Sequence, residues 1–127
     1  MLIEHTSLTR VTSSILSAAG APTNHAEAVA QHLVEANLKG HDSHGVVMLP
    51  SYVKGMLDQQ VDPHRHAEII KDNNAIVNID AGTGLGRVVG IEAMDIGIDR
   101  AQKYGVSCVA LGNAAHLGRI GAFAEHC

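Results

Sequence analysis

Residues 75–94, AIVNIDAGTGLGRVVGIEAM, pass from an apolar run through a glycine-rich turn into a longer amphipathic run. The apolar run is short and β-branched, so it predicts a strand that ends at Asp80. The glycines of residues 82–86 predict a flexible turn, and a helix is expected over residues 88–104, with Gly105 as its cap. Strand, turn and helix in this order predict an α/β unit. The expected apolar face of the helix comprises Val88, Ile91, Met94, Ile98 and Ala101.

The flanking segments extend this unit. Residues 68–71 predict a partner strand, because the Asp-Asn-Asn stretch at 72–74 is typical of a hairpin turn. Residues 106–111 form a short apolar run that predicts a further strand. A loop is expected over residues 113–118, and a last helix over residues 119–127.

The chain before this unit predicts helices. One helix is expected to stop at Gly20, and the next to start with Asn24 and Glu27 as a capping box and to end at Gly40. The apolar face of the first helix is expected to comprise Leu8, Val11, Ile15 and Leu16, followed by Ala18 and Ala19.

A third, shorter helix is expected at Leu49–Leu57, because Pro50 is tolerated in a first helical turn. Residues 41–45 precede it as a turn. The fold class is therefore α/β (α+β), with a helical N-terminal region over residues 1–66. The beginning of an α/β domain follows over residues 67–127.

Composition narrows the function classes. The 127 residues are 46% hydrophobic and 17% charged, which is typical of globular proteins and excludes intrinsic disorder. A net charge of −4 without a basic stripe argues against nucleic acid and anionic membranes as partners. No secretory leader or long apolar run is visible, and Cys108 and Cys127 are too few for a disulfide framework. The expected compartment is the cytoplasm.

The glycine-rich turn invites comparison with the dinucleotide-binding fingerprint G-x-G-x-x-G. Gly82 and Gly84 fit that fingerprint, but Arg87 occupies the third glycine position and the extra glycine, Gly86, comes one residue early. The strand that follows the helix also runs into Asn113 without the acidic residue that reads the ribose. A turn that lets the helix start close to the sheet is the favoured interpretation.

The segment GHDSHG, residues 40–45, allows several interpretations. His41, Asp42 and His44 are residue types that bind metals, although they are crowded into four positions. Ser43 as a nucleophile lacks the usual elbow motif. His44 as a proton donor beside Ser43 suits neutral pH, and helix capping by Asp42 or Ser43 is the alternative without chemistry.

The segment NAAHLGRIG, residues 113–121, places His116 after a strand and before a helix. In α/β folds, ligands gather at the carboxyl ends of strands, and helix N-termini attract anions. His116 is therefore a candidate for chemistry, with an ordinary loop histidine as the alternative.

Four segments occur together and in order: GHDSHG at 40–45, LPSYV at 49–53, IDAGTGLGRVVG at 79–90 and GNAAHLGRIGAFAE at 112–125. Together they resemble the malate/L-lactate dehydrogenase family, the type 2, non-Rossmann NAD(P)-dependent 2-hydroxyacid dehydrogenases. Members are much longer, and the last helix here stops without a cap. The resemblance thus implies the N-terminal part of such an enzyme.

The resemblance implies an enzyme that interconverts a 2-oxo acid and a 2-hydroxy acid, with NAD or NADP and without a metal. It also implies a homodimer and a cofactor bound on a sheet that is not a Rossmann fold. In some branches the histidine matching His116 serves as acid/base. In others the pair matching Ser43 and His44 does so, with the histidine against the nicotinamide.

The cofactor contacts that the resemblance implies are His44, Gly118, Arg119 and Ile120. Many members hold the substrate carboxylate with an arginine four residues after the DSHG histidine, where this chain has Met48. The carboxylate would then be held by Arg119, Arg87 or a residue elsewhere, and a bulkier 2-oxo acid is favoured. Two alternatives remain: a non-catalytic chain that only folds or dimerises, and a metal-binding module built on the nine histidines.

Overall fold

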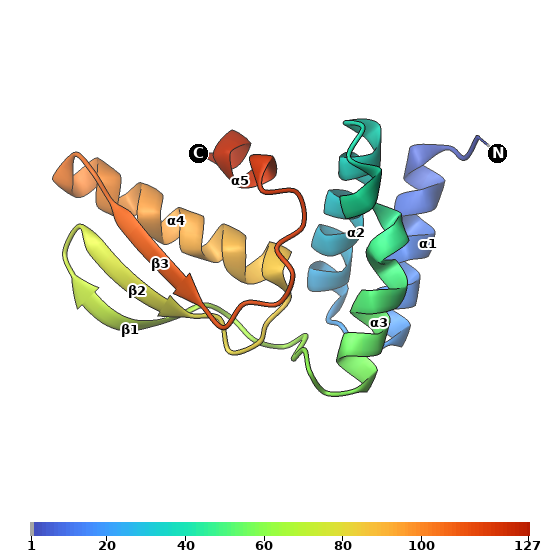
Figure 1. Ribbon diagram of the computed structural model, residues 1–127, viewed down its shortest axis with the longest axis horizontal. Coiled ribbons are helices and arrows are strands. Elements are labelled where there is room, and N and C mark those ends of the chain that lie inside the picture. The colour runs from blue at the N-terminus through green and yellow to red at the C-terminus, as the bar shows by residue number, and fades with distance from the viewer. Residues whose placement is uncertain (1) are drawn as a thin grey trace. The chain divides into compact units, whose positions relative to one another are not determined.

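The computed structural model describes residues 2–127 (Figure 1). The chain divides into two compact units, Met1–His64 and Arg65–Cys127, whereas the sequence predicts a boundary two residues later. The first unit is helical and the second combines helices with a three-stranded sheet, so the predicted α/β class is confirmed. Among the helices of residues 2–127, none has the length and hydropathy that crossing a bilayer requires.

The first unit contains α1 (His5–Ala18), α2 (Thr23–Leu38) and α3 (Leu49–Leu57), which lie side by side in Figure 1. α1 packs along α2 and also contacts α3. Two 3₁₀ turns, η1 (Asp42–His44) and η2 (Val46–Met48), connect α2 to α3. The bounds of α3 match the prediction, and the predicted turn before it is tightly wound.

The prediction for the inward face of α1 was partly wrong. Leu16 is fully buried as expected, and Thr12 is buried beside it. Val11 and Ile15, however, are 52% and 41% exposed. Compared with the prediction, the helix is rotated about its axis. Thr12 and Leu16, which are spaced four residues apart and so lie on one face, point inward instead.

The predicted capping box of α2 was also wrong. α2 begins at Thr23 immediately after Pro22, and no side chain caps it. Asn24 therefore lies inside the first turn. Proline is favourable at a helix start because its φ angle is already close to the helical value, and this moves the start of α2 before the predicted cap.

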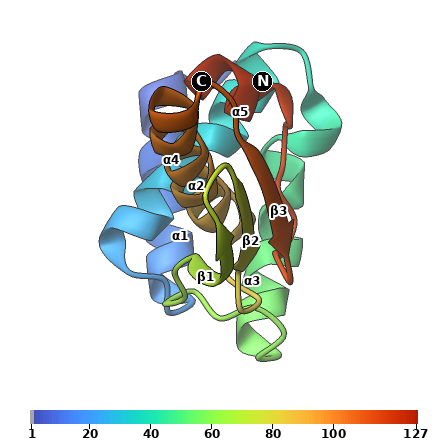
Figure 2. The same ribbon diagram turned by 90° about the vertical axis from the view of Figure 1, so that its left-hand side faces the viewer.

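The second unit is built on a sheet in the order β1 (Glu68–Asn73), β2 (Ile76–Asp80) and β3 (Cys108–Gly112). β1 and β2 form the predicted antiparallel hairpin, and β2 pairs in parallel with β3. α4 (Gly86–Tyr104) connects β2 to β3, and Gly105 ends it with a φ angle of 81°. Figure 2 shows the three strands side by side with α4 lying along the sheet.

The core of the second unit joins the sheet to α4. Its fully buried members are Val77 and Ile79 of β2 with Ala93 of α4, and four further apolar residues pack around them: Ala67, Ile96, Val109 and Leu111.

The predicted apolar face of α4 was therefore only partly right. Small residues lie against the sheet, while Met94 and Ile98 of the predicted face are half-exposed. A Cβ atom on Gly97 would lie 3.0 Å from the Val109 side chain, so a glycine here lets α4 approach β3 closely.

The last helix, α5 (Gly121–His126), begins two residues later than predicted. Arg119 and Ile120 consequently belong to the loop after β3. Their carbonyl oxygens accept the N–H groups of Ala122 and Phe123 at 3.1 and 3.0 Å, which are the short-range bonds of a tight first turn.

Substituting Gly86 at the start of α4 tests the close packing of this unit. A Cβ atom there would lie 2.3 Å from the carbonyl oxygen of His116 and 2.6 Å from that of Ala115. Because backbone atoms cannot rotate away, we expect Gly86→Ala to lower the free energy of unfolding by about 1–3 kcal/mol in urea titrations followed by circular dichroism. Gly97→Ala is the control.

The Cβ atom of the control meets one side-chain methyl at 3.0 Å, and alanine is favoured over glycine in a helix by about 1 kcal/mol. Gly97→Ala should therefore change stability little. Equal stability of the two variants would show that Gly86 is not closely packed.

Candidate functional site

Parallel pairing of β2 and β3 brings the carboxyl ends of both strands to one edge of the sheet. β2 ends at Asp80 and β3 at Gly112, and each is followed by a loop, residues 81–85 and residues 113–120. Ligands of α/β proteins bind outside the carboxyl ends of parallel strands. This edge is therefore the first place to look for a site in the second unit.

Three backbone hydrogen bonds join the two loops. The N–H of Ala81 donates to the carbonyl oxygen of Gly112 (2.9 Å), and the N–H of Thr83 donates to that of Asn113 (2.7 Å). The N–H of Ala115 donates in return to the carbonyl oxygen of Gly84 (3.1 Å). We call residues 81–85 and 112–116 the paired loops.

Asp80, the last residue of β2, accepts hydrogen bonds from both of the paired loops. One carboxylate oxygen accepts both the N–H of Gly82 and the side-chain amide of Asn113, each at 2.9 Å. The Gly82 bond first, then the Asn113 bond and the positive charge of Arg65, hold the pKa of Asp80 below its usual value. The sequence prediction missed Asp80 and Asn113, although an aspartate two residues before a glycine is a recognisable turn signal.

Two residues of the paired loops have left-handed backbone conformations without being glycine. Thr83 and Asn113 have φ angles of 61° and 55°, and the hydrogen bond between them joins the two positions. Such conformations cost of order 1–3 kcal/mol and persist only where the surroundings fix them. The paired loops are thus held in one defined shape.

The glycines beside these loops are packed against the protein itself. A Cβ atom on Gly84 would lie 2.6 Å from the Val89 side chain and 2.9 Å from the carbonyl oxygen of Ala81. At Gly82 the Arg65 guanidinium lies close by, and at Gly86 the backbone of His116 does. These glycines therefore serve helix and loop packing, which agrees with the interpretation that this turn lets the helix start close to the sheet.

The loop after β3 carries the predicted site residues of the second unit. His116 is exposed, Gly118 is buried with a φ angle of 75°, and Ile120 is 61% exposed. Ile120 also borders a small apolar pocket of about 220 Å³. The pocket is lined by Gly90, Ala93, Met94, Val109, Leu111, Leu117, Ile120 and Phe123.

Arg119 is buried and binds Glu125 of α5 through both of its terminal nitrogens. Nη1 donates to one carboxylate oxygen at 2.9 Å and Nη2 to the other at 2.7 Å. The guanidinium of Arg87 lies 5.9 Å from the centre of the Phe123 ring. Arg119 and Arg87 were considered as carboxylate-binding groups because Met48 occupies the position of the usual arginine. Both therefore already contact other side chains.

Ser43 and His44 meet in the turn between α2 and α3. Ser43 Oγ lies 3.0 Å from His44 Nδ1, and the hydroxyl is exposed while the imidazole is half-buried. The side chain of Asn37, in the last turn of α2, contacts the same turn on both sides of His44. The sequence prediction missed Asn37, because nothing local distinguishes it from any polar residue at a helix end.

The structure thus brings together Ser43 and His44 in the first unit. It places His116, Gly118, Arg119 and Ile120 in one loop of the second unit. In residues 2–127, no three histidine, cysteine, aspartate or glutamate side chains gather closely enough to hold a metal ion. The metal interpretation of the GHDSHG segment therefore has no ligand cluster behind it within those residues.

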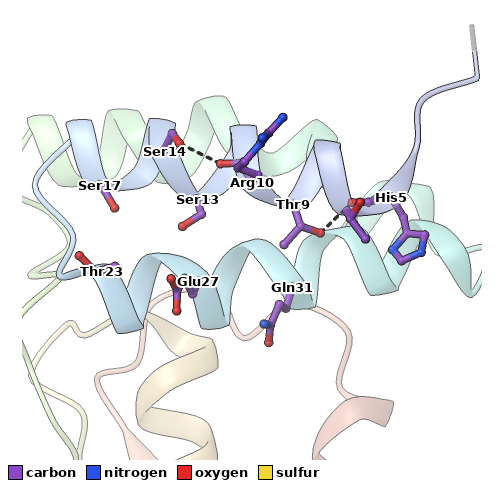
Figure 3. Close-up of a pocket in the computed structure, with 10 residues that line it drawn as sticks. His5, Thr9, Arg10, Ser13, Ser14, Ser17, Thr23, Glu27 and Gln31 are labelled. Atoms are coloured by element: carbon purple, nitrogen blue, oxygen red, sulfur yellow. Dashed lines mark hydrogen bonds between the residues drawn. The ribbon is translucent and has the colours of Figure 1, made fainter.

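A polar cleft of about 810 Å³ lies between α1 and α2, and none of the predicted site residues borders it (Figure 3). Ser13 and Ser17 of α1 face Thr23 and Glu27 of α2 across it. The remaining lining residues are His5, Thr6, Thr9, Arg10, Ser14 and Gln31. Hydroxyl groups dominate, and the few charges are of mixed sign.

Comparison with known proteins matches this chain to one family over nearly its whole length. A family model described as malate/L-lactate dehydrogenase matches residues 3–127. Hydroxycarboxylate dehydrogenase B of Escherichia coli (strain K12) is 44% identical over 108 residues, which are 85% of this chain and 30% of that protein.

Two solved structures are also similar. Malate dehydrogenase from Pyrococcus horikoshii OT3 aligns with a TM-score of 0.94 at 33% identity, and sulfolactate dehydrogenase from Methanocaldococcus jannaschii with a TM-score of 0.93 at 34% identity. Each alignment covers 98% of this chain and 36% of the other. The chain thus spans about a third of the length of the relatives it matches.

The contacts of Asp80 predict how acid affects the second unit. Because the pKa of Asp80 is lower in the folded chain, its stabilising contribution is complete above the unfolded pKa of about 3.9 and is lost as the pH falls through the folded pKa. We expect Asp80→Asn to be less stable at pH 7 and to lose less stability on acidification below pH ~4 than the original chain. Urea unfolding at a series of pH values measures both effects.

The matched control is Asp99→Asn, which removes an exposed carboxylate from α4 of the same unit. Asp99→Asn should lose as much stability on acidification below pH ~4 as the original chain does. If Asp80→Asn and Asp99→Asn give the same pH profile, Asp80 does not fasten the paired loops.

Proposed function

The chain belongs to the malate/L-lactate dehydrogenase family. We propose that it forms part of an NAD(P)-dependent oxidoreductase that interconverts a 2-oxo acid and a 2-hydroxy acid. The single observation in the structure that supports this chemistry most directly is the contact of 3.0 Å between Ser43 Oγ and His44 Nδ1. A histidine beside a hydroxyl can supply and recover the proton that the reaction requires.

When bound in its reduced form, NADH or NADPH, the cofactor would supply the hydride for the carbonyl carbon of the 2-oxo acid. The residues that we propose to hold it, by direct contact or by fixing the loop that makes the contact, are His44, Gly118, Arg119 and Ile120. Ile120 suits this role because it is exposed beside an apolar pocket. The guanidinium of Arg119 is held by Glu125, so we propose that this residue keeps Gly118 and Ile120 in place rather than binding the cofactor through its charge.

The Ser43–His44 pair is suited to proton transfer through Nε2 of the imidazole. A hydroxyl can both donate and accept a hydrogen bond, so Ser43 Oγ can pair with Nδ1 whether or not that nitrogen carries a proton. When His44 is protonated, Nδ1–H donates to Ser43 and Nε2–H can donate to the substrate oxygen. After Nε2 releases its proton, Ser43 Oγ can continue to accept from Nδ1–H, so that Nε2 can take a proton back.

His116 is the second acid/base candidate. It is exposed in the loop that follows β3, at the carboxyl edge of the parallel pair. The backbone on either side is fixed by the paired loops and by the close approach of Gly86. An exposed histidine on a fixed loop at this edge could face a bound ligand, which is why we retain it beside His44.

We propose a 2-oxo acid bulkier than pyruvate as the substrate. Names of relatives include malate, lactate and sulfolactate dehydrogenases. Met48 offers an apolar side chain where an arginine would offer a fork of donors for a carboxylate. We further propose that the enzyme acts in the cytoplasm as a homodimer.

A fluorescence titration with NADH tests whether this chain holds the cofactor. The chain has no tryptophan, so protein emission does not obscure that of the nicotinamide. We expect saturable enhancement with NADH or NADPH, and sedimentation of the same sample should give the mass of a dimer. A flat titration with both cofactors would contradict cofactor binding by this chain and favour the alternative that it only folds or dimerises.

Substitution of the two histidines separates the acid/base candidates. Reduction of pyruvate, oxaloacetate and bulkier 2-oxo acids is followed by loss of NADH absorbance for His44→Asn and His116→Asn. We expect the true acid/base variant to lose about 10²–10⁴-fold in kcat, because general acid catalysis contributes that much. His64→Asn, an exposed histidine in the first unit, is the control. If both candidate variants keep the original turnover, the proposed mechanism is wrong.

A further inference from the structure

The side chain of Asn37 connects α2 to the turn that carries Ser43 and His44. Its amide nitrogen Nδ2 donates to a carboxylate oxygen of Asp42 at 2.6 Å. Its oxygen Oδ1 accepts the backbone N–H of Val46 at 2.8 Å. One contact lies two residues before His44 and the other two residues after it, so Asn37 holds the turn on both sides of the histidine.

The turn leaves space for this amide at Gly45. Gly45 has an extended backbone, so its conformation does not require glycine. A Cβ atom at this position would nevertheless lie 2.1 Å from Asn37 Oδ1 and 2.4 Å from Asn37 Cγ. Gly45 is therefore needed because any side chain there would occupy the space of the Asn37 amide.

Short-range hydrogen bonds support the backbone of the turn itself. The N–H of His44 donates to the carbonyl oxygen of His41 (2.9 Å), and the N–H of Gly45 donates to that of Asp42 (3.1 Å). Such 3₁₀ bonds have poorer geometry than those of an α-helix. The bond to Asp42 is charge-assisted and therefore stronger than a bond between neutral groups.

We propose that Asn37 is a positioning residue for the Ser43–His44 pair. It acts through the turn by fixing the backbone on both sides of His44, so that the imidazole keeps the orientation in which Nδ1 meets Ser43. This inference rests on the proposed function for its consequence in catalysis. Its structural part, the orientation of His44, can be measured without turnover.

Four variants test the role of Asn37. Asn37→Leu keeps the approximate shape and removes both hydrogen bonds, whereas Asn37→Asp keeps the acceptor for Val46 but sets two carboxylates against each other. Asp42→Asn leaves the amide of Asn37 with a neutral partner. The double variant Asn37→Asp/Asp42→Asn exchanges donor and acceptor and restores both contacts. Glu35→Gln, which removes an exposed ion pair with Lys39 on the same helix, is the control.

Two readouts are needed. The first is the ¹⁵N chemical shifts of the His44 ring across a pH titration, which report the tautomer and its protonation. The second is kcat and KM for reduction of the 2-oxo acid by NADH. We expect Asn37→Leu and Asn37→Asp to change the ring shifts and to lower kcat about 10- to 100-fold, with KM for NADH changed less than threefold. The double variant should recover both readouts to within about threefold.

The outcomes distinguish this inference from the proposed function. If the original chain neither binds NADH nor turns over, the proposed function fails, yet altered ring shifts in Asn37→Leu would still support the positioning of His44. Unchanged ring shifts in folded Asn37→Leu would overturn the inference. So would a double variant that is no better than Asn37→Asp, because the restored contact between residues 37 and 42 would then have no effect on His44.

Discussion

The parallel pairing of β2 with β3 is the constraint on which the second unit depends. An antiparallel neighbour would send the loop after β3 to the opposite edge of the sheet, away from the loop after β2. The parallel arrangement sets residues 81–85 beside residues 112–116, where backbone hydrogen bonds join them. α4 can then start directly against the loop that carries His116, since Gly86 has no side chain to obstruct it.

Both units use one short polar side chain to fix a turn that carries a candidate histidine. In the second unit Asp80 accepts two hydrogen bonds and joins the paired loops. In the first unit Asn37 both donates and accepts, and holds the turn around His44. A short side chain loses little rotamer entropy when it is fixed, so such connections order a loop at low cost. The candidate histidines thus lie on loops, while residues of a helix and a strand fix the position of those loops.

Local patterns in the sequence predict much of this fold. Proline and glycine signals gave the bounds of α3 and the end of α4, and the Asp-Asn-Asn stretch gave the β1–β2 hairpin. Errors arose where tertiary packing overrides the pattern. Large apolar residues were expected against the sheet, but the small residues Ala93 and Gly97 are the buried ones on this side of α4. Which face of a helix is buried depends on its partner, which periodicity alone does not describe.

The candidate site was predictable only in part for a similar reason. Histidines in glycine-bounded segments stand out, which is how His44 and His116 were found. The residues that fix them, Asn37 and Asp80, act on positions that the sequence does not mark as partners. The role of Arg119 was also difficult to predict. Its positive charge suggests that it binds an anionic ligand, but in the structure it pairs with Glu125, six residues along the chain.

The pairing of Arg119 with Glu125 bears on how a substrate carboxylate can be held. Arg119 is buried whereas Glu125 is half-exposed, so withdrawing the guanidinium from Glu125 carries the cost of leaving its positive charge with poor access to water and without that carboxylate. A substrate carboxylate would have to offset that cost before adding any affinity. Arg119 is therefore better suited to holding the loop that carries His116, Gly118 and Ile120 against α5. Under the proposed function, with Met48 apolar as well, the substrate carboxylate would be recognised by groups other than these two residues.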